Sequence, residues 1–109
     1  MFVVKMIKYI YHYIYPQPIK RKATPKRIKN ELWVKYHGTS FLGQCYCCGK
    51  TIDKLNYHNA HVIPHAHGGL MTVDNLRTTC AHCNMSCGVK NLYTFIKDKH
   101  LKGPGSQIL

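Results

Sequence analysis

Acidic residues are nearly absent from this chain. Its 109 residues include 16 lysines and arginines but only four aspartates and glutamates, so the formal charge at pH 7 is +12 with neutral histidines. A charged surface that serves only solubility mixes both signs, and this composition does not. The one-sided charge indicates a polyanionic partner, and nucleic acid is favoured over an anionic membrane surface.

The chain also lacks a membrane-length apolar run and the length for a second domain. One small core is expected, because about 100 to 200 residues form one domain. The most apolar stretch, MFVVKMIKYIYHYIY, is too short and too charged to span a bilayer, and no small-residue cleavage site follows it. Its apolar spacing predicts a basic amphipathic helix packed on the domain; a membrane-surface helix and an edge strand stay open.

We assign residues 1–38 to a basic N-terminal extension. Pro16 and Pro18 end the first element, and an exposed basic arm follows. Thr24 and Pro25 predict the N-cap and first turn of a helix that continues to about Tyr36. Contacts with nucleic-acid phosphates, independent of base sequence, are expected from Lys20, Arg21, Lys22, Lys26, Arg27 and Lys29.

Two CxxC pairs offer the additional cross-link, through a metal ion or disulfides, that a core of this small size needs for stability. Cys45 with Cys48 and Cys80 with Cys83 are separated by 31 residues, and Gly49 suits a tight turn after the first pair. Zinc binds four thiolates tetrahedrally, so we predict a structural Zn²⁺ site at these four cysteines. Disulfides would require an oxidising compartment that nothing in the N-terminal sequence indicates, and an intracellular, reducing location is therefore expected.

The segment between the two pairs reads NYHNAHVIPHAHGGLMTVDNLRTTC. We expect a strand at residues 57–63, a loop at 64–75 and a short strand at 76–79. A helix is expected from residue 84 to about residue 97, and residues 101–109 are expected to form a loose tail. The expected module at residues 39–100 is therefore strand, loop, strand and helix, closed by zinc.

The order CxxC, HVIP, GG, DNLR and CAHCN resembles the HNH endonucleases of the ββα-metal (His-metal finger) fold, in their zinc-stapled branch. The resemblance covers residues 45 to about 97, and similar small stand-alone proteins occur in phages and large DNA viruses. It implies an α+β fold, with a zinc-stapled ββα-metal (HNH) module and an N-terminal basic helical extension. It also implies hydrolysis of phosphodiester bonds in double-stranded DNA, with Mg²⁺ or Mn²⁺ as the catalytic cofactor.

The resemblance implies roles for three residues. His61, which precedes the sequence VIP, falls on the general base, and a neutral imidazole can take a proton from water near physiological pH. Asn75 falls on the asparagine that braces the loop, and Asn84 on a residue that offers an amide oxygen to the catalytic cation. Arg77 lies on the strand before the second CxxC pair, where it is expected to contact a phosphate or, alternatively, to be an ordinary surface arginine.

Ala60 departs from the family pattern. Many members carry Asp or His directly before the general base as a second cation ligand, and alanine cannot bind metal. On a regular strand Asn59 projects to the same side as His61, whereas His58 projects with Ala60. We expect a replacement ligand among four neighbours, for each of which an ordinary polar residue is the alternative: His58, Asn59, His65 and His67.

Two further classes of function stay open. A zinc-containing nucleic-acid-binding protein that retains the fold without cutting is favoured by Ala60, whereas His61 and Asn84 favour the enzyme. A structural basic protein packed with a viral genome would need only the charge. The oligomeric state is also open, because nicking requires one copy whereas cleavage of both strands often requires a homodimer.

Overall fold

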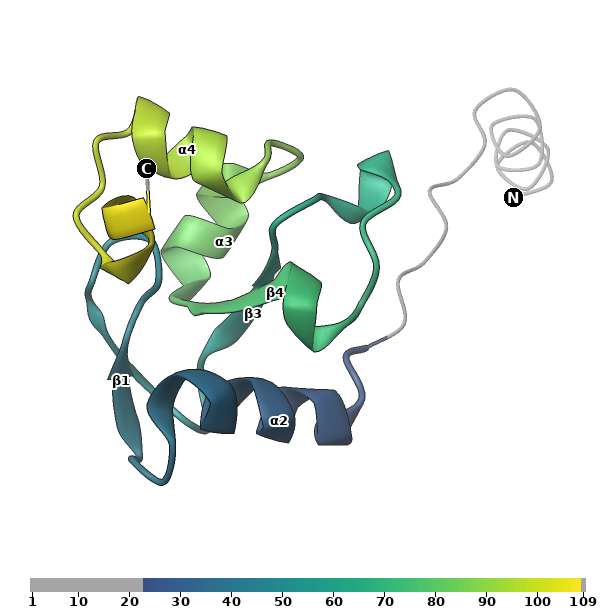
Figure 1. Cartoon of the computed structure of the whole chain (residues 1–109), viewed down its shortest axis with the longest axis vertical. Coiled ribbons are helices and arrows are strands. Elements are labelled where there is room, and N and C mark those ends of the chain that lie inside the picture. The colour runs from purple at the N-terminus through teal and green to yellow at the C-terminus, as the bar shows by residue number, and fades with distance from the viewer. Residues whose placement is uncertain (1–22, 109) are drawn as a thin grey trace, which may run out of the picture.

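A computed structural model describes residues 23–108 of the chain (Figure 1). The predicted N-terminal helix, together with Lys20, Arg21 and Lys22, lies outside this range. The described elements are α2 (Lys26–His37), β1 (Leu42–Gln44), β2 (Thr51–Asp53), β3 (His58–His61), the 3₁₀ turns η1 (His65–His67) and η2 (Val73–Asn75), β4 (Leu76–Thr79), α3 (Ala81–Cys87), α4 (Leu92–Asp98) and η3 (Pro104–Ile108). Helices combined with small antiparallel sheets make an α+β fold, as predicted. Within residues 23–108, no helix is both long and apolar enough to cross a membrane.

Two separate antiparallel hairpins form the β structure. β1 pairs with β2, and the first CxxC pair lies in the connection between them. β3 pairs with β4 from His58 opposite Thr79 to His61 opposite Leu76, without an interruption of the register. β4 has the predicted bounds, while β3 is shorter than predicted. Alternation along a regular strand puts His58 with Ala60 on one face and Asn59 with His61 on the other.

Helix α2 packs through Leu32 and Trp33, which are both almost completely buried. The Trp33 ring contacts the Tyr57 ring at a centroid distance of 5.1 Å, and its Nε1 donates to the Ser40 carbonyl oxygen at 2.7 Å. The expected Thr24 cap is wrong, because α2 has Pro25 at its N-cap and no side chain caps it. The Thr24 hydroxyl accepts a hydrogen bond from the Asn59 side chain instead, at 2.7 Å.

The single helix expected after the second CxxC pair is two helices, α3 and α4. Gly88 ends α3 with φ of 57°, a conformation that interrupts a right-handed helix and suits glycine. Asn91 then begins α4, since its side-chain oxygen accepts from the backbone N–H of Tyr93 at 3.0 Å. α4 buries Leu92, Phe95 and Ile96 in the core.

The C-terminal residues are packed on the first CxxC turn, so the prediction of a loose tail is wrong. The Gly103 N–H donates to the Cys47 carbonyl oxygen at 2.9 Å, and the Gly105 N–H donates to that of Tyr46 at 2.8 Å. A Cβ atom at Gly103 would lie only 2.6 Å from the Cys47 backbone. Glycine permits this close approach of two backbones, which sequence composition alone does not reveal.

Candidate metal centre and active site

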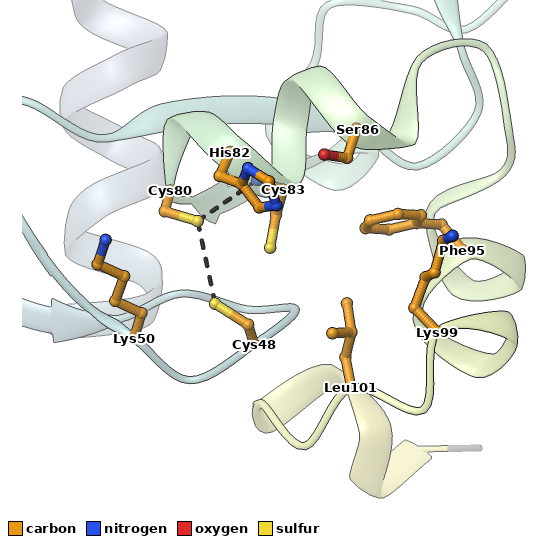
Figure 2. Close-up of a pocket in the computed structure, with 9 residues that line it drawn as sticks. All are labelled: Cys48, Lys50, Cys80, His82, Cys83, Ser86, Phe95, Lys99 and Leu101. Atoms are coloured by element: carbon orange, nitrogen blue, oxygen red, sulfur yellow. Dashed lines mark hydrogen bonds between the residues drawn. The ribbon is translucent and has the colours of Figure 1, made fainter.

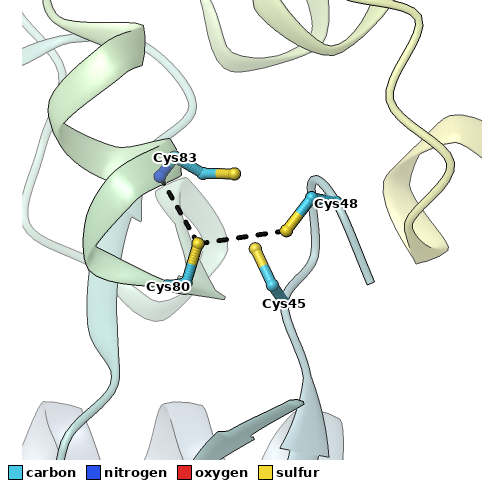
Figure 3. A group of neighbouring side chains, drawn as sticks. All are labelled: Cys45, Cys48, Cys80 and Cys83. Atoms are coloured by element: carbon cyan, nitrogen blue, oxygen red, sulfur yellow. Dashed lines mark hydrogen bonds between the residues drawn. The ribbon is translucent and has the colours of Figure 1, made fainter. Parts of the chain in front are cut away.

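The four predicted zinc ligands come together in the structure (Figure 3). The sulfurs of Cys45, Cys48, Cys80 and Cys83 all lie within 4.8 Å of one another, and those of Cys48 and Cys80 are 3.9 Å apart. Four sulfurs at about 2.3 Å from one zinc ion in a tetrahedron lie about 3.8 Å from each other. The cluster therefore fits a zinc ion, and each of its cysteines is free of disulfide bonds.

Local structure explains why these sulfurs converge. Gly49 has φ of 80°, and its N–H donates to the Cys45 carbonyl oxygen at 2.9 Å, which closes the turn after the first pair. Cys80 is the N-cap of α3, and its sulfur accepts from the Cys83 N–H at 3.4 Å. The second pair therefore lies at the junction of β4 and α3. Zinc bound here would connect the β1–β2 hairpin to the β3–β4–α3 unit.

The thiols of this cluster differ in acidity. A hydrogen bond from the Cys47 side chain, opposed by burial, lowers the pKa of Cys45 to about 4. Burial raises the pKa of Cys83 far above its usual range, and the neighbouring Cys45 adds to this effect. A metal ion must therefore displace protons from the buried thiols when it binds.

A cavity of about 500 Å³ lies beside the cysteine cluster (Figure 2). Four thiolates around one Zn²⁺ carry a formal charge of −2, and the ammonium groups of Lys50 and Lys99 are the nearby charges of opposite sign. The residues that line the cavity are Cys48, Lys50, Cys80, His82, Cys83, Ser86, Phe95, Lys99 and Leu101. This cavity lies on the side of α3 that carries His82 and Ser86, and Asn84 does not line it.

Asn75 braces the loop that follows His61. Its Oδ1 accepts from the Ile63 N–H at 2.9 Å, and its Nδ2 donates to the carbonyl oxygens of Ile63 at 3.1 Å and Leu70 at 2.9 Å. The loop also closes through the Gly69 N–H, which donates to the Pro64 carbonyl oxygen at 2.9 Å. One side chain thus holds both ends of the loop at residues 63–70.

His61 is the last residue of β3 and is half-buried. Its Nε2 atom is shielded from solvent. The next residue, Val62, donates its N–H to the Asn75 carbonyl oxygen at 2.8 Å, so the brace begins one residue after the predicted general base.

Asn84 lies on α3 beside His58 of β3. The Asn84 Nδ2 is 3.3 Å from the His58 Nδ1, and both residues are half-buried. An amide NH₂ group can only donate, so the lone pair of the His58 Nδ1 points at Asn84. Ala60, on the same face of β3, is 2% exposed and belongs to the hydrophobic core.

The other three predicted replacement ligands lie elsewhere. Asn59 is on the opposite face of β3 from His58 and donates to the Thr24 hydroxyl. His65 and His67 form the exposed turn η1, and in the described part of the chain neither has a hydrogen bond to Asn84. These four candidates cannot be ranked from the sequence, because the ranking depends on how α3 lies against β3.

Arg77 is engaged inside the fold. Its Nη1 donates to the carbonyl oxygens of Asp74 and Leu76, each at 2.8 Å, and its guanidinium lies 5.8 Å from the Tyr36 ring centroid and 5.6 Å from that of Tyr46. These aromatic partners are far from Arg77 in the sequence, and no sequence pattern predicts the contacts. The contact with phosphate stays a prediction.

Of the six predicted phosphate-contacting residues, the three that the structure describes lie in the first turns of α2. Lys26 and Arg27 are exposed, whereas Lys29 is half-buried with its Nζ 5.4 Å from the Tyr57 ring centroid. Lysine commonly packs its stem while its charge reaches solvent. Lys26 and Arg27 are therefore available to a polyanion, and their contact with one stays a prediction.

An antiparallel strand pair, a following helix and a four-cysteine cluster that fits zinc define a ββα-metal module. A family model described as HNH endonuclease matches residues 45–100, slightly more than half of the chain. The chain therefore belongs to the HNH endonuclease family. Comparisons with curated proteins and with solved structures find no match. Membership of this family indicates a nuclease or nucleic-acid-related function, with nucleic acid as the substrate class.

Proposed function

We propose that this protein is a metal-dependent endonuclease that hydrolyses phosphodiester bonds, mainly in double-stranded DNA. The observation that carries the proposal is the brace close to His61: within an HNH family match, the Asn75 side chain fixes the loop at residues 63–70, which begins two residues after this histidine. The formal charge of +12 supports a polyanionic substrate.

The proposed roles divide between three residues. His61, as a neutral imidazole, takes a proton from the attacking water. Asn75 positions His61 through the backbone of the next two residues. Asn84 offers its amide oxygen to a divalent cation, which when bound stabilises the leaving 3′ oxygen. Zinc at the four cysteines has a structural role, since it fixes the start of the helix that carries Asn84.

One observation favours a second function. The buried methyl group of Ala60 provides no metal ligand at the position where many family members have one. A protein of this kind could bind nucleic acid through its basic surface without cutting. This alternative is a non-catalytic zinc-containing nucleic-acid-binding protein. It predicts that the protein binds DNA but does not cleave it in the presence of any divalent ion.

A plasmid assay separates the two functions. Supercoiled plasmid is incubated with zinc-loaded protein and either Mg²⁺ or Mn²⁺; open circles report nicking, and linear plasmid reports cleavage of both strands, as a homodimer would produce. His61→Ala is expected to abolish cleavage while gel-shift binding of the plasmid persists. His82→Ala, an exposed histidine on α3, is the matched control and is expected to cleave normally. Binding without cleavage by the unmodified protein with either ion would refute the nuclease.

We also propose a reducing, intracellular location. All six cysteines are free in the structure, including Cys47 and Cys87, which take no part in the four-cysteine cluster. Free thiols next to a zinc site are compatible with a reducing compartment, whereas an oxidising one would favour disulfides.

A further inference from the structure

We propose that His58, together with Asn84, holds the catalytic divalent cation, and that this pair favours a first-row transition ion such as Mn²⁺ over Mg²⁺. The assignment deepens the proposed function, and it rests on that function only in calling the ion catalytic. It supplies from two residues upstream the ligand that Ala60 lacks.

The first support is the geometry of the pair. Two adjacent ligands at about 2.1 Å from one ion lie about 3.0 Å apart in octahedral geometry and about 3.4 Å apart in tetrahedral geometry. The Asn84 Nδ2 and His58 Nδ1 are 3.3 Å apart. A half-turn of the Asn84 amide exchanges its nitrogen and oxygen, which would direct an oxygen and an imidazole lone pair at the same point.

The second support is the position of the pair in the fold. His58 and Ala60 share the face of β3 that α3 covers, and His58 pairs with Thr79, one residue before Cys80. α3 begins directly after Cys80, so its first turn brings Asn84 opposite His58. His58 lies two residues, or about 7 Å along the strand, nearer to the second CxxC pair than Ala60 does.

The third support is ligand chemistry. Imidazole nitrogen suits transition ions, whereas Mg²⁺ prefers oxygen ligands, above all carboxylates. Glu31, Asp53, Asp74 and Asp98 are the only acidic residues of the chain, and none has a hydrogen bond or ion pair with His58 or Asn84 in the described range. A neutral imidazole and amide pair leaves the remaining positions around the ion to water and phosphate.

Paramagnetic broadening tests the site without DNA and without activity. Zinc-loaded, full-length protein is titrated with Mn²⁺, and the side-chain NMR signals of Asn84, His58 and His82 are followed. The Asn84 and His58 signals are expected to broaden first. In His58→Ala, broadening of the Asn84 signal is expected to require at least about tenfold more Mn²⁺. His82→Ala, whose histidine lies on the cavity side of α3, is expected to leave the Asn84 response unchanged.

A second variant changes the ligand without removing it. His58→Asp is expected to shift the preference toward Mg²⁺, so that less Mg²⁺ is needed to reverse the broadening caused by Mn²⁺. Each variant is first checked for bound zinc and for its melting temperature. Broadening of Asn84 that is unchanged in His58→Ala, or Mg²⁺ competition that is unchanged in His58→Asp, would overturn the assignment.

The outcomes separate this assignment from the proposed nuclease. Broadening at His58 and Asn84 in a protein that never nicks plasmid supports the ion site and refutes the nuclease. Nicking by a protein in which these two signals do not broaden first supports the nuclease and refutes the ion site.

Discussion

Replacing Asn75 by alanine removes the side-chain bonds that brace the histidine loop, keeps the backbone bond from the Val62 N–H to the carbonyl oxygen of residue 75, and leaves both CxxC pairs intact. The substitution deletes three hydrogen bonds, one accepted from Ile63 and two donated to the carbonyl oxygens of Ile63 and Leu70. The methyl group of alanine can replace none of them. Folding stability and cleavage should therefore fall together while zinc content stays constant.

The size of the effect follows from these contacts. A hydrogen bond in a protein contributes about 0.5 to 1.5 kcal/mol net, so three bonds contribute roughly 1.5 to 4.5 kcal/mol. Asn75 is half-buried, so water replaces part of what is lost, and we expect a loss of about 2 kcal/mol in the free energy of unfolding. For a domain of this size that corresponds to a decrease of roughly 10 °C in melting temperature.

Urea unfolding with zinc in excess measures this change, and the plasmid assay measures its effect on cleavage. The nicking rate is expected to fall about 100-fold, because a displacement of about 1 Å at a catalytic group is enough for such a loss. Asn56→Ala is the matched control: Asn56 lies in an exposed turn, where its side chain bonds to Asp53, and a change below about 0.5 kcal/mol is expected. An Asn75→Ala protein as stable as this control would refute the bracing role.

Three more predictions concern the metal, the C-terminal packing and the charge. Mass spectrometry under native conditions should find one zinc ion per chain. Cys48→Ser, or addition of a chelator, should lower the zinc content and the melting temperature together. A melting temperature that neither change affects would count against a structural zinc site. Gly103→Ala should lower the free energy of unfolding by about 1 to 3 kcal/mol, because the Cβ of the new alanine overlaps the first CxxC turn. The same urea titration should show little change for the control Lys102→Ala, since Lys102 is exposed. Affinity for duplex DNA should fall steeply between 50 and 200 mM salt, and Lys26→Ala should reduce the log–log slope by about 1; a slope near zero would exclude phosphate contacts as the main source of affinity.

Local patterns predicted the zinc cluster and β4 because each depends on a few neighbouring residues. CxxC spacing places two sulfurs in one turn, and the strand at 76–79 has the bounds expected from the sequence. The predicted helix at residues 84–97 was wrong because Gly88 was not recognised as a helix end. The β1–β2 hairpin was not predicted at all, since each of its strands is only three residues long.

The arrangement of the candidate site depends on packing between distant segments. Sequence could name His58, Asn59, His65 and His67 as candidates, but the proximity of His58 to Asn84 depends on how α3 packs against β3. The tyrosines around Arg77 come from three different parts of the chain and converge only in the folded state. Residue types therefore predicted the ligand chemistry, whereas the pairing of ligands required the tertiary structure.

The contact of Gly103 and Gly105 with residues 46 and 47 has a consequence for protein synthesis. A ribosome makes the first CxxC turn more than fifty residues before the segment that covers it. A chain interrupted before Gly103 would contain all four cysteines of the cluster, but the carbonyl oxygens of Tyr46 and Cys47 would lose the partners they have in the complete fold. Such shortened chains keep the four cysteine ligands but are expected to be less stable, and therefore cleaved faster by proteases, than chains that include Gly103 and Gly105.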